Sequence, residues 1–386
     1  MRLSPWSPAL LAALVLAGCK SEKPAAPAVQ DSGPPAAAAV ATPPPVPAPV
    51  PVPKPPPEPA HSLSFLQPSD PERCEWVRQP LPSGEQVAVF SFNGACDRSM
   101  VSWSPDGKEG LVFTWPSGTG EVPKAWTVDV ATHTGKVLDL KPLPGGKDVG
   151  GQDKPYIEEV SFDEQGRPVA IVADVYAKRT PQKGKGGQKT LSYEGQSYPL
   201  QEGVEGLPGL AHAFRLEEGS WKHVETKASG FESDLAPGTH ELETVKTLGT
   251  IAKASAPEHG LPGGDAPQGA AAKLDAAFPG QDETGQWMML TTPGGPVYFR
   301  GVQGGETLYP SVPVVWEQGG KLVELEGLLA KTDDVIDLQV EEGMLLVAGY
   351  GDPRAAQLWD IKTKQRVFSA ADASAPAFWP KPASPK

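Results

Sequence analysis

The residues best suited to chemistry are three cysteines, Cys19, Cys74 and Cys96, which are the only thiols among 386 residues. A cysteine can be a small buried apolar side chain, half of a disulfide, or a site of covalent attachment. The chain has no Cys-x-x-Cys, so neither a dithiol redox site nor a cysteine zinc site is indicated. The role of each thiol therefore depends on the segment that carries it.

The remaining candidate groups match no catalytic or metal-binding spacing. No two histidines have the spacing of a zinc helix, and no Gly-x-Ser-x-Gly nucleophile elbow is present. One acidic group offers oxygen ligands for calcium, but its spacing fits no calcium loop, and a solvated acidic turn is the favoured interpretation. The histidines are His61, His133, His212, His223, His240 and His259, and the acidic group is Asp333, Asp334, Asp337, Glu341 and Glu342. We therefore predict no metal, no cofactor and no enzymatic activity.

The overall charge argues against one class of partner. The formal net charge is −13 and the pI is about 5.0, so nucleic-acid binding through a basic face is not expected. One local basic segment, from Ala177 to Gly187, carries Lys178, Arg179, Lys183 and Lys185. A solvated loop is its favoured interpretation, with contact to anionic lipid or a partner as the alternative.

The first nineteen residues have the pattern of an export signal. Arg2 precedes an unbroken apolar run of nine residues, Ala9 to Ala17, which is too short to cross a bilayer but suits the apolar region of a secretory signal. Leu16-Ala17-Gly18-Cys19 resembles the bacterial lipobox. The resemblance implies a signal peptide over 1–18, cleavage before Cys19 and acylation of Cys19. An ordinary signal peptide or a membrane anchor, with a coincidental cysteine, is the alternative.

The resemblance also implies a location. Lysine rather than aspartate at position 20 favours sorting to the outer membrane, where we expect the protein on the periplasmic face. Several acyl chains would hold it stably, since one chain alone binds only marginally.

A proline-rich segment follows. Residues Pro24 to Ala60 hold fifteen prolines among 37 residues and almost no aromatic or branched apolar side chains, so no core is expected. Proline at this density favours a semi-rigid polyproline II spacer, which would reach roughly 100 Å when extended. We expect a disordered linker over 19–72 that serves as a stalk, with passive disorder as the alternative.

The folded part is expected over 73–380 and begins at the other two cysteines. Glu75–Arg78 and Gln86–Phe90 are predicted strands joined by a turn at Leu81–Gly84. A disulfide between Cys74 and Cys96 would close about 22 residues and stabilise the fold by roughly 3 kcal/mol. Two free buried thiols are the alternative.

The rest of the chain predicts an all-β repeat protein. Three segments, at Val101–Phe113, Val160–Val172 and Leu338–Val347, each pair two strands around a glycine turn, and Val169–Ala173 and Met344–Ala348 have the apolar runs of strands buried on both faces. The aromatic residues at 126, 214, 316 and 359 are spaced by 88, 102 and 43, which fits a unit of about 44 residues. That period predicts a β-propeller of about six or seven blades.

Two of these segments carry a resemblance to known repeats. Val101–Phe113, with Ser-Trp-Ser-Pro-Asp-Gly-Lys, resembles the WD-like propeller repeat of TolB-type periplasmic proteins, and Leu358–Val367 resembles the closing strands of a WD-repeat blade. Residues 228–280 depart most from the pattern and yield no blade, with Gly269–Phe278 as a short helix candidate. A pair of β-sandwiches or an irregular β domain is the alternative fold.

Two functions follow as expectations. The first is a membrane-anchored envelope lipoprotein whose propeller is a non-catalytic scaffold for an unknown envelope protein. The second is a ligand-sensing or hydrolytic propeller with its site in the central channel. The first is favoured because no catalytic spacing is present.

Overall fold

The computed structural model describes residues 61–380, apart from 71, 83, 117–120, 148–154, 175–181, 184–188, 194, 201–206, 232–262, 280–284, 305–306, 331–334 and 352–353. All described residues belong to one compact unit, Pro57–Lys386. Cys19, the proline-rich segment and most of the basic segment at 177–187 lie outside the described residues. No helix in the described part is long and apolar enough to cross a membrane.

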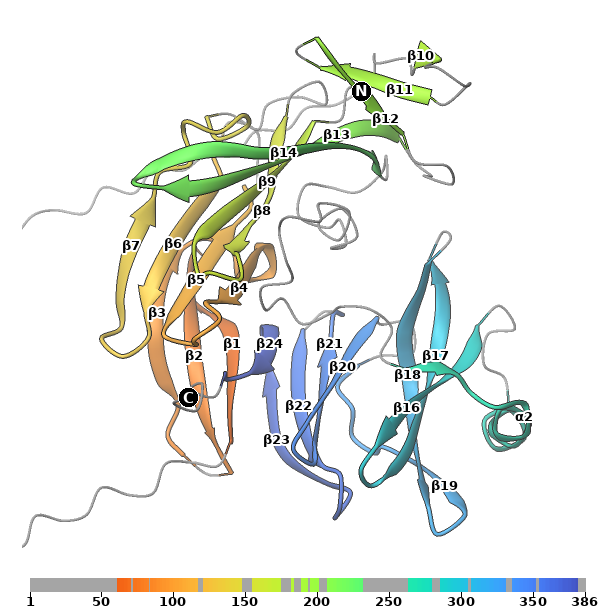
Figure 1. Ribbon diagram of the computed structural model, residues 1–386. Coiled ribbons are helices and arrows are strands. Elements are labelled where there is room, and N and C mark those ends of the chain that lie inside the picture. Colours follow the sequence, from red (N-terminus) through yellow and green to blue (C-terminus); the bar gives the residue numbers. More distant parts are fainter. Residues whose placement is uncertain are drawn as a thin grey trace, which may run out of the picture. The chain divides into compact units, whose positions relative to one another are not determined.

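The fold is an all-β propeller built from successive antiparallel sheets, which we call blades 1 to 5 (Figure 1). Blade 1 holds β24 (Ser374–Phe378), β1 (His61–Asp70), β2 (Arg73–Leu81) and β3 (Val87–Asn93). Blade 2 holds β4 (Ser99–Trp103), β5 (Glu109–Thr114), β6 (Lys124–Asp129) and β7 (Thr134–Leu138). Blade 3 holds β8 (Tyr156–Phe162), β9 (Pro168–Asp174), β13 (Leu207–Glu217) and β14 (Ser220–Phe231).

Two further blades lie in the described part of the second half, which gives five blades among the described residues against the predicted six or seven. Blade 4 holds β15 (Gly264–Asp265), β16 (Gln286–Thr292), β17 (Gly295–Gly304), β18 (Thr307–Gln318) and β19 (Lys321–Glu324). Blade 5 holds β20 (Ile336–Glu341), β21 (Met344–Gly349), β22 (Ala355–Asp360) and β23 (Gln365–Ala371). Between β9 and β13, a three-stranded sheet is made of β10 (Gln182–Lys183), β11 (Lys189–Tyr193) and β12 (Gln196–Pro199).

The predicted repeat is confirmed at the level of individual strands. The aromatic residues Trp126, Phe214, Trp316 and Trp359 lie in β6, β13, β18 and β22, each followed by the last strand of its blade. The three predicted pairs around glycine turns are β4–β5, β8–β9 and β20–β21. A tight turn joins β4 and β5, where Asp106 Oδ1 accepts the Ser104 hydroxyl at 2.8 Å and Gly107 has φ +69°. The short helix is also confirmed, as α2 (Gln268–Ala277).

The blades are buried on both faces, which explains their continuous apolar runs. In β21, Leu345 and Val347 pack against blade 4, whereas Leu346 packs against blade 1. In β5, Leu111 and Phe113 pack against blade 3 and Val112 against blade 1. Alternate residues along one strand thus enter two different cores.

One predicted boundary is wrong. The linker was expected to extend to residue 72, but His61–Asp70 forms β1, so the fold begins twelve residues before the predicted 73. Leu63, Phe65 and Leu66 are each at most 1% exposed, and β1 pairs with both β2 and the C-terminal strand β24 (Figure 1). A strand from each end of the described chain therefore completes blade 1.

Candidate functional site

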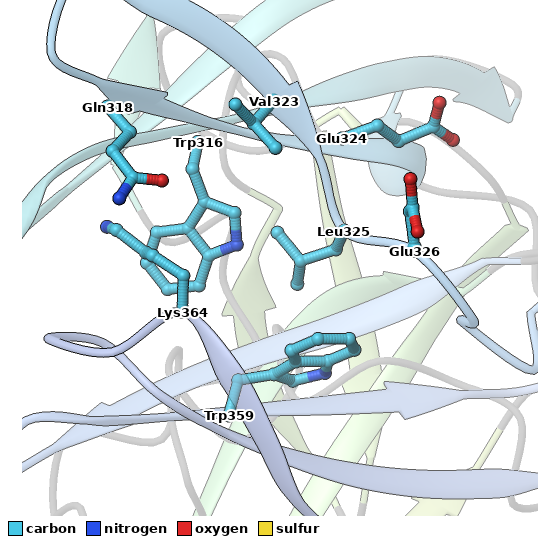
Figure 2. Close-up of a pocket in the computed structure, with 8 residues that line it drawn as sticks. All are labelled: Trp316, Gln318, Val323, Glu324, Leu325, Glu326, Trp359 and Lys364. Atoms are coloured by element: carbon cyan, nitrogen blue, oxygen red, sulfur yellow. The ribbon is translucent and has the colours of Figure 1, made fainter.

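A pocket of about 320 Å³ lies against blades 4 and 5 (Figure 2). The residues that line it are Trp316, Gln318, Val323, Glu324, Leu325, Glu326, Trp359 and Lys364. Trp316 and Trp359 are the repeat aromatics of the two blades, and both pack with Leu325 in one apolar cluster. The repeat thus places two indole rings on either side of a blade junction.

The turn after β22 brings a cation to this pocket. Asp360 Oδ1 accepts the backbone N–H of Thr363 at 2.6 Å, and Lys364 has a left-handed backbone with φ 60°. The Lys364 Nζ lies 3.8 Å from the centre of the Trp316 ring and donates to the Gly294 carbonyl at 3.2 Å. Desolvation lowers the pKa of Lys364 from its ordinary value.

The two pocket indoles differ from other tryptophans of the fold. The Nε1 groups of Trp76, Trp115, Trp221 and Trp287 each donate a hydrogen bond at 2.8–2.9 Å. The Nε1 atoms of Trp316 and Trp359 are buried and have no hydrogen-bond partner, and these residues are only 2% and 5% exposed. A buried donor without an acceptor costs about 1–3 kcal/mol. An acceptor that reached either donor, such as a ligand oxygen or a water molecule, would satisfy a buried polar group.

The rim of the pocket is acidic and partly apolar. Glu324 and Glu326 carry the carboxylates, and the Val323 residue is 43% exposed. Val323 and Glu324 belong to β19, the outermost strand of blade 4 in the sheet order. The charged groups among the eight lining residues are thus two carboxylates and one ammonium group.

The predicted disulfide is confirmed. Cys74 and Cys96 are bridged with their Cα atoms 5.3 Å apart, and the alternative of two free thiols is wrong. The bridge joins β2 to the short 3₁₀ turn Cys96–Arg98. Cys74 is 0% exposed and Cys96 is 8% exposed. A second hollow, of about 340 Å³, lies beside it, with Arg73, Asp97 and Arg354 among its lining residues.

The other candidate residues are dispersed. No group of three or more metal-ligating side chains occurs in the described part. Asp337 accepts hydrogen bonds at 2.8 Å from the Leu338 N–H and the Gln339 side chain, whereas Asp333 and Asp334 lie outside the described residues. His133 sits in an exposed turn, while His212 and His223 lie with ring centres 6.1 Å apart in blade 3.

Sequence reasoning missed a buried carboxylate in β8. Glu158 and Glu159 are each 5% exposed, and the pairing of β8 with β9 shifts register at this point. Burial, followed by the charge of Glu159, raises the pKa of Glu158 to about 8, despite a hydrogen bond with Tyr156. The available signal was two consecutive glutamates within a strand of otherwise apolar character.

Comparisons with known proteins yield no family. No family model matches the chain, and no curated protein matches it either. Solved structures do match. A putative 6-phosphogluconolactonase from Bacteroides fragilis is 13% identical, with a TM-score of 0.31 over 84% of this chain and 99% of that one.

Two further matches are as distant. The dihydro-heme d1 dehydrogenase NirN is 10% identical, with a TM-score of 0.34 over 82% of this chain and 74% of that one. The β-propeller domain of the Trilobed protease from Pyrococcus furiosus is 10% identical, with a TM-score of 0.22 over 78% of each chain.

These matches correct one prediction. The lack of a catalytic spacing was taken to predict a protein that is not an enzyme, but the similar structures include a putative lactonase, a dehydrogenase and peptidases. A propeller holds side chains from strands far apart in sequence, so a linear motif is not required for a catalytic site. At these identities and TM-scores, the likeness assigns no particular chemistry to this chain.

Proposed function

We propose that this chain is a lipid-anchored protein of the bacterial cell envelope whose propeller binds another envelope protein at the pocket of Trp316 and Trp359. In this proposal, residues 1–18 are a signal peptide, Cys19 carries the acyl chains, and the proline-rich segment up to residue 60 tethers the propeller. Leu16-Ala17-Gly18-Cys19 supports the anchor, and Lys20 supports sorting to the outer membrane, where we propose the periplasmic face.

One observation carries the binding role: two buried indole N–H groups, in residues that line one pocket, have no acceptor. A bound polypeptide offers backbone carbonyl oxygens as acceptors. A basic side chain of that polypeptide would meet Glu324 and Glu326 at the rim, and an apolar one would meet Val323. Because β19 ends the sheet order of blade 4 among the described residues, its outer edge can also pair with an extended segment.

The partner proposed on this chemistry is an extended segment that contains a basic residue. Affinity capture with the purified full chain tests it, in parallel with the variant Glu324→Gln/Glu326→Gln. The unaltered chain is expected to retain an envelope protein that the variant loses. Glu218→Gln, in the exposed turn between β13 and β14, is the matched control and should retain the partner. Equal retention by all three proteins would refute binding at this pocket.

A further inference from the structure

A cluster of polar side chains in blade 3 lies apart from the proposed binding pocket. The Asp174 Oδ2 atom at the end of β9 is 3.6 Å from His212 Nε2 in β13. This is an electrostatic contact rather than a hydrogen bond, because Nε2 is buried without a hydrogen-bond partner. The other ring nitrogen, His212 Nδ1, is 2.8 Å from the Thr226 hydroxyl in β14. The same hydroxyl is 2.8 Å from His223 Nε2. Carboxylate, imidazole and hydroxyl thus follow one another across three adjacent strands.

Strand register and a bulge in β14 bring two imidazoles to the Thr226 hydroxyl. Thr226 lies directly opposite His212 in the pairing of β13 with β14, so their side chains share one face. Glu225 pairs with Ala213 and His223 pairs with Phe214, which leaves Val224 as an extra residue. Without that extra residue, His223 would point to the opposite face. The bulge therefore brings a second imidazole to the Thr226 hydroxyl.

Neighbouring rings hold the two imidazoles in place. The Tyr193 ring, from β11 of the three-stranded sheet, lies 4.6 Å from the His212 ring, centre to centre. The Phe214 ring lies edge-on to His223 at 5.4 Å. His212 is 2% exposed, whereas Thr226 is half-buried and His223 is exposed. The His212 ring is thus shielded from solvent, whereas Thr226 and His223 lie nearer the surface.

The roles of these groups depend on which His212 nitrogen carries the proton. The nearby Asp174 carboxyl group favours the tautomer with the proton on Nε2 electrostatically, and in that tautomer Nδ1 is an acceptor. His212 Nδ1 then accepts from the Thr226 hydroxyl, and His223 Nε2–H donates to the same oxygen. Nucleophile, base and orienting group are therefore in the order needed for acyl transfer.

We propose that Thr226 is the nucleophile of an esterase-type site, with His212 as general base and Asp174 as the positioning residue. In the first step the Thr226 Oγ1 bonds to the carbonyl carbon of a carboxylic ester, and its proton passes to His212 Nδ1. The carbon–alkoxide bond breaks, and His212 returns the proton to the leaving alkoxide as an alcohol. Water then attacks the acyl-threonine, His212 takes its proton and returns it to Thr226 Oγ1, and the carboxylic acid leaves.

The probe for this proposal is p-nitrophenyl acetate with the purified full chain. Release of p-nitrophenolate should fall about 100-fold in Thr226→Val and in His212→Gln, as expected for loss of a nucleophile or its base. Thr226→Ser keeps a hydroxyl and should retain activity. His133→Gln, at an exposed turn, is the control for hydrolysis by a surface imidazole and should leave the rate unchanged.

Mass spectrometry of the acid-quenched unaltered protein provides a measurement that needs no variant. An acetyl group on Thr226 supports the proposal. Acetylation at other residues only, or equal rates for the unaltered protein and Thr226→Val, overturns it. This site shares no residue with the pocket of blades 4 and 5, so its failure leaves the binding proposal standing, and the reverse also holds.

Discussion

Lys364, from the turn between β22 and β23 of blade 5, lies over the ring of Trp316 in blade 4 at 3.8 Å. Its Nζ also donates to the carbonyl of Gly294, in the turn between β16 and β17. One side chain therefore joins two blades and places a positive charge in an otherwise acidic pocket. A basic ligand that enters the pocket must compete with this resident cation.

Replacement of Lys364 should thus affect stability and binding in opposite directions. Lys364→Met keeps the aliphatic stem but loses the cation–π contact and the hydrogen bond, so the free energy of unfolding should fall by about 1 kcal/mol. Binding of the basic partner should become tighter, because repulsion is removed. Urea unfolding and titration of the captured partner measure the two effects. Lys362→Met, exposed in the same turn, is the control, and weaker binding by Lys364→Met would contradict the predicted sign.

The disulfide should contribute substantially to stability. It closes a sequence separation of 22 residues, for which the chain-entropy model gives about 3 kcal/mol. Cys74→Ser/Cys96→Ser should lower the denaturant midpoint, and a reductant should lower the midpoint of the unaltered protein but not that of the variant. An identical midpoint with and without reductant would show that the bridge does not stabilise the fold.

The buried Glu158 should make stability depend on pH. Its pKa is raised to about 8 in the folded protein, against an ordinary value of 4.5. The folded state therefore holds a proton that the unfolded state has released, and stability falls as pH rises from about 5 to about 8. Glu158→Gln, which cannot ionise, should flatten this fall, whereas Glu164→Gln in the exposed turn after β8 should not. Equal slopes in urea unfolding for the unaltered protein and Glu158→Gln would contradict the assignment.

The anchor proposal predicts the fate of two variants in cells. Cys19→Ala should move the protein from the membrane fraction to the soluble fraction or leave it unprocessed. Lys20→Asp should shift it from the outer to the inner membrane under the enteric sorting rule. Fractionation followed by detection of the propeller measures both. Retention of a processed Cys19→Ala protein in the membrane would refute lipidation at this residue.

The fold was predictable because its signals are local. Trp126, Phe214, Trp316 and Trp359 mark equivalent strands, and turn residues such as Asp106 and Gly107 determine the tight connections. Trp76 in β2 occupies the same strand of blade 1 as these aromatic residues do in their blades. The repeat pattern did not include it, because the first strand of blade 1, β24, comes from the C-terminal end of the chain. The strand β1 was also missed, because it follows the proline-rich segment directly and pairs with the C-terminal strand β24.

The functional groups were not predictable, because they depend on contacts between strands. Nothing in the sequence distinguishes Trp316, whose N–H has no acceptor, from Trp76, whose N–H reaches Ser64 at 2.8 Å. Asp174, His212 and Thr226 follow no motif spacing. The register of β9, β13 and β14 brings them together, and this register cannot be deduced from one strand alone.

Site-specific photocrosslinking tests the binding claim most directly. A photoreactive residue at Val323, on the pocket rim, is compared in intact cells with one at Val137 in blade 2, which is 67% exposed. The account predicts a discrete crosslinked envelope protein from position 323, absent from position 137 and lost when Glu324→Gln/Glu326→Gln is added. No crosslinked protein at position 323, or the same products from both positions, would contradict it.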